Sequence, residues 1–351
     1  MNLRTAGIRL GLETLYFSGV SKLFGPLSAG IGTIFTMHHV RPARADAFQP
    51  NALLEIEPAF LESLIEYLRY KKIDMVSLAE AKRRLREQVY TKRFVCFTLD
   101  DGYRDNLEFA FPIFKKHDVP AAIFIASNFP EKTGLLWWLA LELAIGATDR
   151  VEIEMNGVTH VFDCANAGAK QDTYEKIYWW LRGLSDETEL RRIVIALCER
   201  YGVDPLGPCK ELCMSWDQLK QLAADPLITI GAHSVTHPML KKWDAGNVKH
   251  ELAESASAIE KALGNKPLDF AYPVGDKTSA GAREFALAKE AGYELGVTTR
   301  PGVIFPEHRE HMTALPRISL NGYFQKIRYA DVLRSGVPFS LPTYFRRLDV
   351  A

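Results

Sequence analysis

The segment Phe94-Val-Cys-Phe-Thr-Leu99 runs directly into Asp100, Asp101 and Gly102. Such a short and almost wholly apolar run predicts a strand that is buried on both faces, as in a parallel sheet covered by helices. In parallel α/β folds the functional residues lie at the carboxyl ends of the strands. Two adjacent carboxylates raise each other's pKa, and a metal ion relieves this conflict when it binds one and leaves the other free as a base. The alternative is a helix N-cap followed by a solvated aspartate.

Similar apolar runs recur along the chain and alternate with helical patterns. The expected strands are 33–37, 94–99, 121–126, 228–232, 270–272 and 295–298. The expected helices are 58–71, 107–116, 248–263 and 283–291, and a capping box at Ser77-Leu-Ala-Glu80 opens another. This alternation predicts βαβ units and a parallel sheet, with a strand count that approaches a barrel.

Residues 130–214 interrupt this alternation. They are mostly helical in pattern, with a strand pair expected around 151–162 because Asn156-Gly157 is a favourable hairpin turn. We therefore expect a helical insertion or lid between two halves of one α/β domain. The expected boundaries are 1–30 for an N-terminal amphipathic helical segment, 31–129 and 215–322 for the two barrel parts, 130–214 for the insertion and 323–351 for a C-terminal extension.

The overall charge excludes one class of partner. The chain has 351 residues, with 43 Lys plus Arg and 43 Asp plus Glu, so its formal net charge is zero. Nucleic-acid-binding domains are usually strongly basic, so we expect no nucleic-acid partner. Five irregularly spaced cysteines are not a disulfide framework and favour a reducing compartment. Cys209 and Cys213 lack a second cysteine pair that would complete a structural zinc site.

The N-terminal segment is too interrupted for a membrane span or a signal peptide. The uncharged stretch 23–40 contains three glycines and a proline, and 8–20 contains Arg9 and Glu13. The apolar residues of 8–20 instead predict an amphipathic helix that packs on the domain or lies on a membrane surface. The expected localisation is cytoplasmic, with peripheral membrane association as an alternative.

A second cluster of candidate ligands follows the expected strand 228–232. It contains His233-Ser-Val-Thr-His237, and two imidazoles four residues apart face the same way if the segment turns helically. With one aspartate they form a three-ligand set that leaves coordination positions open, which is typical of catalytic metal sites. This set suits Zn²⁺, with Fe²⁺, Co²⁺ or Mn²⁺ as alternatives. Alone, the two residues also fit ordinary surface histidines.

Two further expected strands end in candidate catalytic groups. Phe270-Ala-Tyr-Pro-Val-Gly275 forms a tight Pro-x-Gly turn that can direct a backbone N–H at a site, although a plain turn is the simpler interpretation. Ile34-Phe-Thr-Met-His38-His39-Val40 ends in two histidines, and histidine is the commonest general acid near neutral pH. Surface histidines are the alternative.

Thr-x-Asp-Asp-Gly followed by His-Ser-x-x-His-Pro resembles the polysaccharide deacetylase superfamily, also called the NodB-homology or carbohydrate esterase family 4 group. The resemblance covers 33–128 and 213–320. It implies a distorted (β/α)7-type barrel and a divalent metal, commonly zinc, bound by Asp101, His233 and His237. It also implies that Asp100 is the general base in hydrolysis of N-acetyl groups on an N-acetylglucosamine-type oligosaccharide or polysaccharide.

The chain departs from the usual family motifs in ways that fit one branch. Ala271 stands where the third motif has arginine, Val274 stands where it has an aromatic residue, and the late Leu-x-x-His motif is absent. In biofilm poly-N-acetylglucosamine deacetylases of the IcaB and PgaB kind, an early Tyr-His-x-Val supplies the acid. Met37-His-His-Val40 matches this pattern with Met for Tyr. The resemblance therefore implies that His38 is the acid and that Arg317 replaces the missing arginine.

Several residues remain secondary candidates. The backbone N–H of Val274 is expected to hold the oxyanion, and Tyr272 and Trp243 are candidate substrate contacts. Alternative acids are His39, His308 and His311. The insertion contains Trp137, Trp138, Trp179 and Trp180, which either stack on sugar rings or pack in a core.

Three other functions remain open. One is a catalytically silent carbohydrate-binding barrel, which the lost motif arginine and late histidine favour. Another is the same metal chemistry on an O-acetyl ester or a small cyclic amide. A metallophosphoesterase is disfavoured because no second ligand cluster for a bimetallic site is visible.

Overall fold

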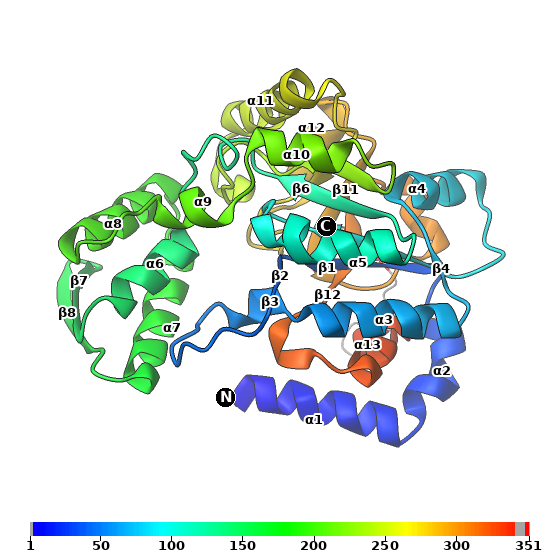
Figure 1. Cartoon of the computed structure of the whole chain (residues 1–351), viewed down its shortest axis with the longest axis horizontal. Helices are drawn as coiled ribbons and strands as arrows, with labels where there is room; N and C mark the ends of the chain where they lie inside the picture. The colour runs from blue at the N-terminus through cyan, green and yellow to red at the C-terminus, as the bar shows by residue number, and fades with distance from the viewer. Residues whose placement is uncertain (1–2, 341–347, 351) are drawn as a thin grey trace.

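Seven parallel strands form a closed ring at the centre of this computed structural model, which describes residues 3–340 and 348–350 (Figure 1). The order around the ring is β1-β12-β11-β10-β9-β6-β5, and pairing of β5 with β1 closes it. The strand bounds are β1 (Gly32–Met37), β5 (Phe94–Leu99), β6 (Ala121–Ile125), β9 (Ile228–Ala232), β10 (Asp269–Ala271), β11 (Leu295–Pro301) and β12 (Leu315–Ser319). The short β4 (Asp74–Met75) adds to β5 outside the ring. The expected barrel is confirmed.

The apolar runs of these strands reflect burial on both faces. Every residue of β1, β5 and β6 is buried. Alternate residues belong to two different apolar clusters because successive side chains of a strand point to opposite faces. Ile34, Cys96 and Phe124 belong to a cluster made largely of strand residues around the ring. Phe35 and Phe97 belong to the larger cluster that the strands share with the surrounding helices.

Helices and short turns surround the ring. The helices are α3 (Pro58–Tyr70), α4 (Leu78–Glu87), α5 (Phe111–Lys116), α10 (Trp216–Ala223), α11 (Ala245–Leu263) and α12 (Ala282–Glu290). A π-helical turn, η2 (Asn106–Ala110), precedes α5, so the helix expected over 107–116 begins irregularly. The 3₁₀ turns are η1 (Ala52–Leu54), η3 (Leu240–Lys242), η4 (Pro306–Glu310) and η5 (Gly322–Phe324), and β2 (His39–Val40) pairs with β3 (Glu55–Ile56).

The insertion forms a lobe beside the barrel, on the side of β2 (Figure 1). It contains α6 (Trp137–Gly146), β7 (Arg150–Met155), β8 (Val158–Asp163), α7 (Ala167–Gly183), α8 (Glu187–Arg200) and α9 (Gly207–Leu212). The hairpin turns at Asn156 and Gly157 with φ of 54° and 78°, as a type I′ turn requires. The lobe has its own apolar cluster, which continues to Tyr103 and Met239 of the barrel.

The N-terminal helices α1 (Leu3–Phe17) and α2 (Val20–Ser28) pack against α13 (Ile327–Arg334) and α14 (Val337–Ser340) (Figure 1). Leu12 of α1 is buried with Tyr329 and Val332 of α13. The carboxylate of Glu13 accepts hydrogen bonds from Arg328 at 2.6 and 2.8 Å and from the Tyr329 hydroxyl at 2.5 Å. Among the described helices, none has the length and apolar character needed to cross a membrane.

Candidate active site

Three buried residues from separate positions in the chain converge at the carboxyl ends of the strands. Asp100 and Asp101 directly follow β5, His233 directly follows β9, and His237 lies four residues further along the same loop. Their potential ligand atoms all lie within 4.8 Å of one another. The Nε2 atoms of His233 and His237 lie 3.6 and 3.4 Å from Asp101 Oδ1. This convergence of two imidazoles and a carboxylate is the set expected from the sequence.

The electrostatics of this cluster fit a bound cation. Asp101 Oδ1 is buried and lacks a hydrogen-bond partner among the described residues. Burial, and then the charge of Asp100, raise the pKa of Asp101 to about 8. Burial also lowers the pKa of His233 and His237, so both imidazoles are neutral at pH 7. Neutral imidazoles and an otherwise uncompensated buried carboxylate are the donors that a divalent cation requires.

The orientation of His233 supports the same conclusion. Its Nδ1–H donates to the carbonyl oxygen of Ala271, the N–O distance being 2.6 Å. This bond fixes the tautomer and leaves the Nε2 lone pair directed towards Asp101, as in histidine ligands held by a second hydrogen bond. Ala271, which stands in place of the motif arginine, therefore contributes through its backbone.

The backbone around the cluster adopts unfavourable conformations. Four non-glycine residues there have positive φ: Asp101 (71°), Ser234 (67°), His237 (58°) and Val274 (62°). A β-branched residue such as valine is a marked outlier in this region, and such strain gathers at functional sites. Gly102 has φ of 65°, and a Cβ there would lie 2.7 Å from Ile125 Cγ2, so a side chain is excluded on both grounds. The histidines therefore face one another through a left-handed loop and not through the helical turn expected from their spacing.

Two charged residues that the sequence did not single out hold the histidine loop. Glu251 of α11 is buried, and its carboxylate accepts bonds from the backbone N–H groups of Val235 and Thr236 at 2.8 and 2.9 Å and from the Thr236 hydroxyl at 2.9 Å. Arg191 of α8 donates from Nη2 to the Thr236 carbonyl at 2.7 Å. The insertion thus contacts the backbone next to His237.

Asp100 lies beside the cluster in a different environment. Arg317 of β12 forms a two-pronged ion pair with it, with Nη1–Oδ1 and Nη2–Oδ2 distances of 2.8 and 2.6 Å. The Thr36 hydroxyl donates to the same carboxylate at 3.3 Å. Burial alone raises the pKa of Asp100, but the charge and hydrogen bonds of Arg317 outweigh it and hold this pKa well below its usual range. Asp100 is therefore ionised at pH 7.

His38 and His39 have separate surroundings. Burial lowers the pKa of His38 to about 4, and the nearby charge of Asp100 acts against this shift. His39 points elsewhere, because its Nδ1 lies 2.5 Å from Asp105 Oδ2 and its ring stacks on Tyr103 at 3.6 Å. His38 thus senses the charge of Asp100, whereas His39 is held by Asp105 and Tyr103.

The other candidate residues differ in their burial and in the groups that they contact. Tyr272 is buried in the main core, where its hydroxyl donates to the Thr313 carbonyl, so it presents no free polar group to a substrate. Trp243 packs partly buried against the same core. His308 and His311 precede β12 and therefore lie on the amino-terminal side of the ring.

The four tryptophans of the insertion differ in how deeply they are buried. Trp138 is buried, with its ring centre 4.9 Å from that of His237, and Trp137 stacks on Tyr178. Trp179 is exposed, and Trp180 donates from Nε1 to Asn156 at 3.2 Å. The first pair therefore packs in the core of the insertion beside the site, whereas Trp179 is exposed and Trp180 packs partly buried against that core.

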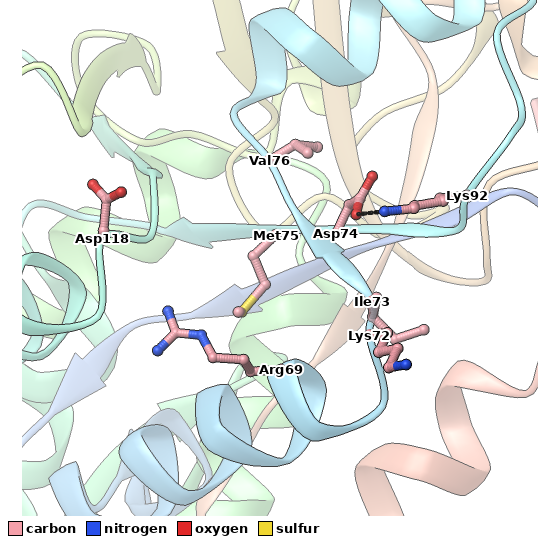
Figure 2. Close-up of a pocket in the computed structure, with 8 residues that line it drawn as sticks. All are labelled: Arg69, Lys72, Ile73, Asp74, Met75, Val76, Lys92 and Asp118. Carbon is pink, nitrogen blue, oxygen red and sulfur yellow. Dashed lines mark ion pairs between the residues drawn. The ribbon is translucent and has the colours of Figure 1, made fainter.

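A surface pocket elsewhere on the molecule is unrelated to these residues. Figure 2 shows it beside β4, where Lys92 reaches Asp74 at 3.8 Å. Its lining residues are Arg69, Lys72, Ile73, Asp74, Met75, Val76, Lys92 and Asp118. None of them belongs to the strand-end cluster, so we place the active site at the cluster.

Comparison with known proteins agrees with this arrangement. A family model described as polysaccharide deacetylase matches residues 87–296, which is more than half of the chain. The chain therefore belongs to the polysaccharide deacetylase family, and it is a hydrolase that acts on carbon–nitrogen bonds other than peptide bonds. Members of this family are generally metal-dependent. No curated protein sequence matches the chain.

Solved structures show the same fold at low sequence identity. The Streptococcus pyogenes deacetylase PplD, in complex with acetate, is 17% identical with a TM-score of 0.57, over 86% of this chain and 96% of that one. IcaB from Ammonifex degensii is 18% identical with a TM-score of 0.52, over 87% and 96%. A de-N-acetylase from Aggregatibacter actinomycetemcomitans is 13% identical with a TM-score of 0.53, over 86% and 99%.

Proposed function

We propose that the chain is a metal-dependent deacetylase that hydrolyses N-acetyl groups on an N-acetylglucosamine-type oligosaccharide or polysaccharide. The observation that carries this proposal is the buried convergence of Asp101, His233 and His237 beside an arginine-paired Asp100. We assign the first three as ligands of Zn²⁺ and Asp100 as the base. Such an uncharged substrate is also consistent with the zero net charge of the chain.

The residues divide the reaction between them. A divalent cation bound by the three ligands supplies Lewis-acid polarisation of the acetyl carbonyl and a lower pKa for water. Asp100 is ionised and takes a proton from the attacking water. Arg317 keeps Asp100 ionised and fixes the direction of its lone pairs. The Val274 N–H is assigned to the oxyanion, because the strained turn brings this backbone to the carboxyl end of β10.

We assign His38 as the group that protonates the departing amine. With a pKa of about 4 it is neutral before the reaction, so it can accept the proton that Asp100 has removed from water. Passing this proton to the amide nitrogen releases the sugar amine and acetate. The net change is one water consumed and one C–N bond broken, with Asp100 and His38 returned to their starting states.

The remaining assignments concern the rest of the chain. We propose that 130–214 is one inserted lobe that covers the site, that 31–129 and 215–322 form the barrel, and that 1–30 and 323–351 are terminal extensions. This division is supported by the separate apolar cluster of the lobe. All five cysteines are buried as free thiols, which supports a reducing compartment such as the cytoplasm.

The experiment is a paired assay of acetate and free amine. Protein reconstituted with Zn²⁺ is incubated with chitin oligomers and with poly-N-acetylglucosamine, and chelator-treated protein serves as the control. We expect equal amounts of acetate and new amine from the metal-loaded protein alone. Acetate without amine, from an O-acetylated polymer, would instead establish an esterase. Absence of acetate from all of these substrates would favour the silent carbohydrate-binding barrel.

A further inference from the structure

The first two helices expose large apolar side chains, and two charged side chains of α1 turn inward. Surface helices normally turn charged side chains to water and apolar ones to the core. In α1, Arg9 turns inward and donates to the Tyr323 carbonyl at 3.1 Å, and Glu13 turns inward to Arg328. The outer side carries Leu10 and Phe17, which are 70% and 74% exposed. Arg9 and Glu13 thus hold α1 to α13 and the C-terminal region. The side chains of Leu10 and Phe17 stay exposed.

The second helix also exposes large apolar side chains. In α2, Ser21 and Gly25 are buried against the body, whereas Leu23 and Leu27 are 72% and 77% exposed and Phe24 is half exposed. Six of the thirteen most exposed large apolar side chains of the described chain lie on α1 and α2: Ile8, Leu10, Phe17, Leu23, Phe24 and Leu27. Apolar side chains gathered in this way on a soluble surface mark an interaction site.

The charges around these helices have one sign. Residues 1–28 contain three cations and one carboxylate, and that carboxylate is Glu13, which already binds Arg328 and Tyr329. Lys22 is exposed beside Leu23. Arg93 lies against the end of α2, where it donates to the carbonyls of Pro26 and Gly30 at 3.2 and 3.3 Å. The rim of the apolar surface is therefore basic.

We propose that the outer face of α1 and α2 docks this enzyme on a lipid bilayer that contains anionic lipids. The exposed leucines and phenylalanines enter the boundary between headgroups and acyl chains, and Lys22 and Arg93 meet the lipid phosphates. A second copy of the chain fits less well, because a symmetric contact through this face would bring two basic rims together. The proposal is independent of the deacetylase reaction.

The position of the surface is compatible with catalysis. α2 leads directly into the amino-terminal end of β1, since Ser28 and Gly32 are close in the chain. The active-site residues lie at the carboxyl ends of the same strands. α2 therefore lies near the end of the barrel opposite the site, and α1 runs alongside α13.

The test is co-sedimentation of the full chain with sucrose-loaded vesicles of phosphatidylcholine and phosphatidylglycerol in a 7:3 ratio. The double variant Leu23→Ser/Leu27→Ser removes two protruding side chains that touch little else. We expect it to bind these vesicles at least about tenfold more weakly than the unmodified protein. Lys22→Glu is expected to weaken binding a few-fold on these vesicles and to have no effect on pure phosphatidylcholine.

A matched control is available on the insertion. Val158 and Val161 of β8 are 57% and 50% exposed, so Val158→Ser/Val161→Ser removes comparable apolar surface elsewhere and should leave vesicle binding unchanged. Both double variants should release acetate from soluble oligomers at the unmodified rate, which separates membrane docking from the reaction. Absence of vesicle binding, or equal binding by Leu23→Ser/Leu27→Ser, would overturn the proposal. So would a dimer in sedimentation velocity that this variant converts to a monomer.

Discussion

Two pairs of like residues lie side by side in the ring, and each pair is split between two tasks. Met37 of β1 is in register with Leu99 of β5, so His38 and His39 follow one strand where Asp100 and Asp101 follow its neighbour. Asp100 has an arginine partner, whereas Asp101 faces two imidazoles.

The histidines divide in the same manner. The charge of Asp100 acts on the pKa of His38. The Nδ1 atom of His39 instead lies against Asp105 Oδ2. Side chains that are identical in the sequence thus acquire different chemistry from partners that lie far away in the chain.

The largest difference is expected between the two aspartates. Asp101→Asn removes a ligand and should abolish Zn²⁺ retention and reduce acetate release by about 10³-fold or more. Asp100→Asn should keep the metal and lower kcat by about 10²–10⁴-fold, because it removes the base alone. Metal content after gel filtration, measured together with kcat, distinguishes the two. Retention of full metal content by Asp101→Asn would contradict the ligand assignment.

The histidine pair should separate activity from stability. His38→Ala is expected to lower kcat by about 10²-fold or more with a small effect on unfolding, because it removes the proton carrier. His39→Ala leaves Asp105 without its ring partner and should lower the free energy of unfolding by about 1–3 kcal/mol while most activity remains. Urea unfolding measures the free energy of unfolding of both variants. A normal rate in His38→Ala would show that another group protonates the departing amine.

The pairing of Asp100 can be tested by removing its partner. Arg317→Met leaves a buried carboxylate unpaired and should cost about 3–5 kcal/mol of stability. The double variant Asp100→Asn/Arg317→Met should recover much of this loss without recovering turnover. Failure of the double variant to regain stability would show that Arg317 acts mainly through Thr98 and Thr298, to which it also donates.

The contact between the insertion and the histidine loop should have a moderate effect. Arg191→Met removes the bond to the Thr236 carbonyl and should weaken Zn²⁺ binding about tenfold, as loss of outer hydrogen bonds around a metal site commonly does. Arg192→Met is the matched control, because Arg192 is the next residue of the same helix and its side chain is exposed. The ligand-field spectrum of the Co²⁺-substituted protein should change in the first variant and not in the second.

A further effect is expected on the pH dependence of stability. The pKa of His38 is lowered from 6.5 to about 4 in the folded chain, so between these values the unfolded state binds more protons. Folding stability in chelator-treated protein should therefore fall as pH decreases from 6.5 to 4. His38→Gln should reduce this fall by about 3 kcal/mol at most. An identical pH profile in the two proteins would contradict the lowered pKa of His38.

The fold was largely predictable because its signals are local. Each buried strand is an apolar run, and Asp101 and His233 follow such runs directly, so parallel strand ends bring them together. Arg317 was inferred from the arginine missing at Ala271. Glu251, Arg191 and Asp105 were not predicted, because their partners lie elsewhere in the chain and no local pattern marks them.

The closure of the ring has a consequence for how the enzyme forms. Arg317 and Asp100 are separated by 217 residues, and β12 enters between β1 and β11 as the last strand of the barrel. Contacts so distant in the chain are formed slowly, because a long loop must close before they contribute. A nascent or truncated chain that lacks β12 therefore has an open barrel and an unpaired base. The base therefore gains its arginine partner only after β12 has completed the ring.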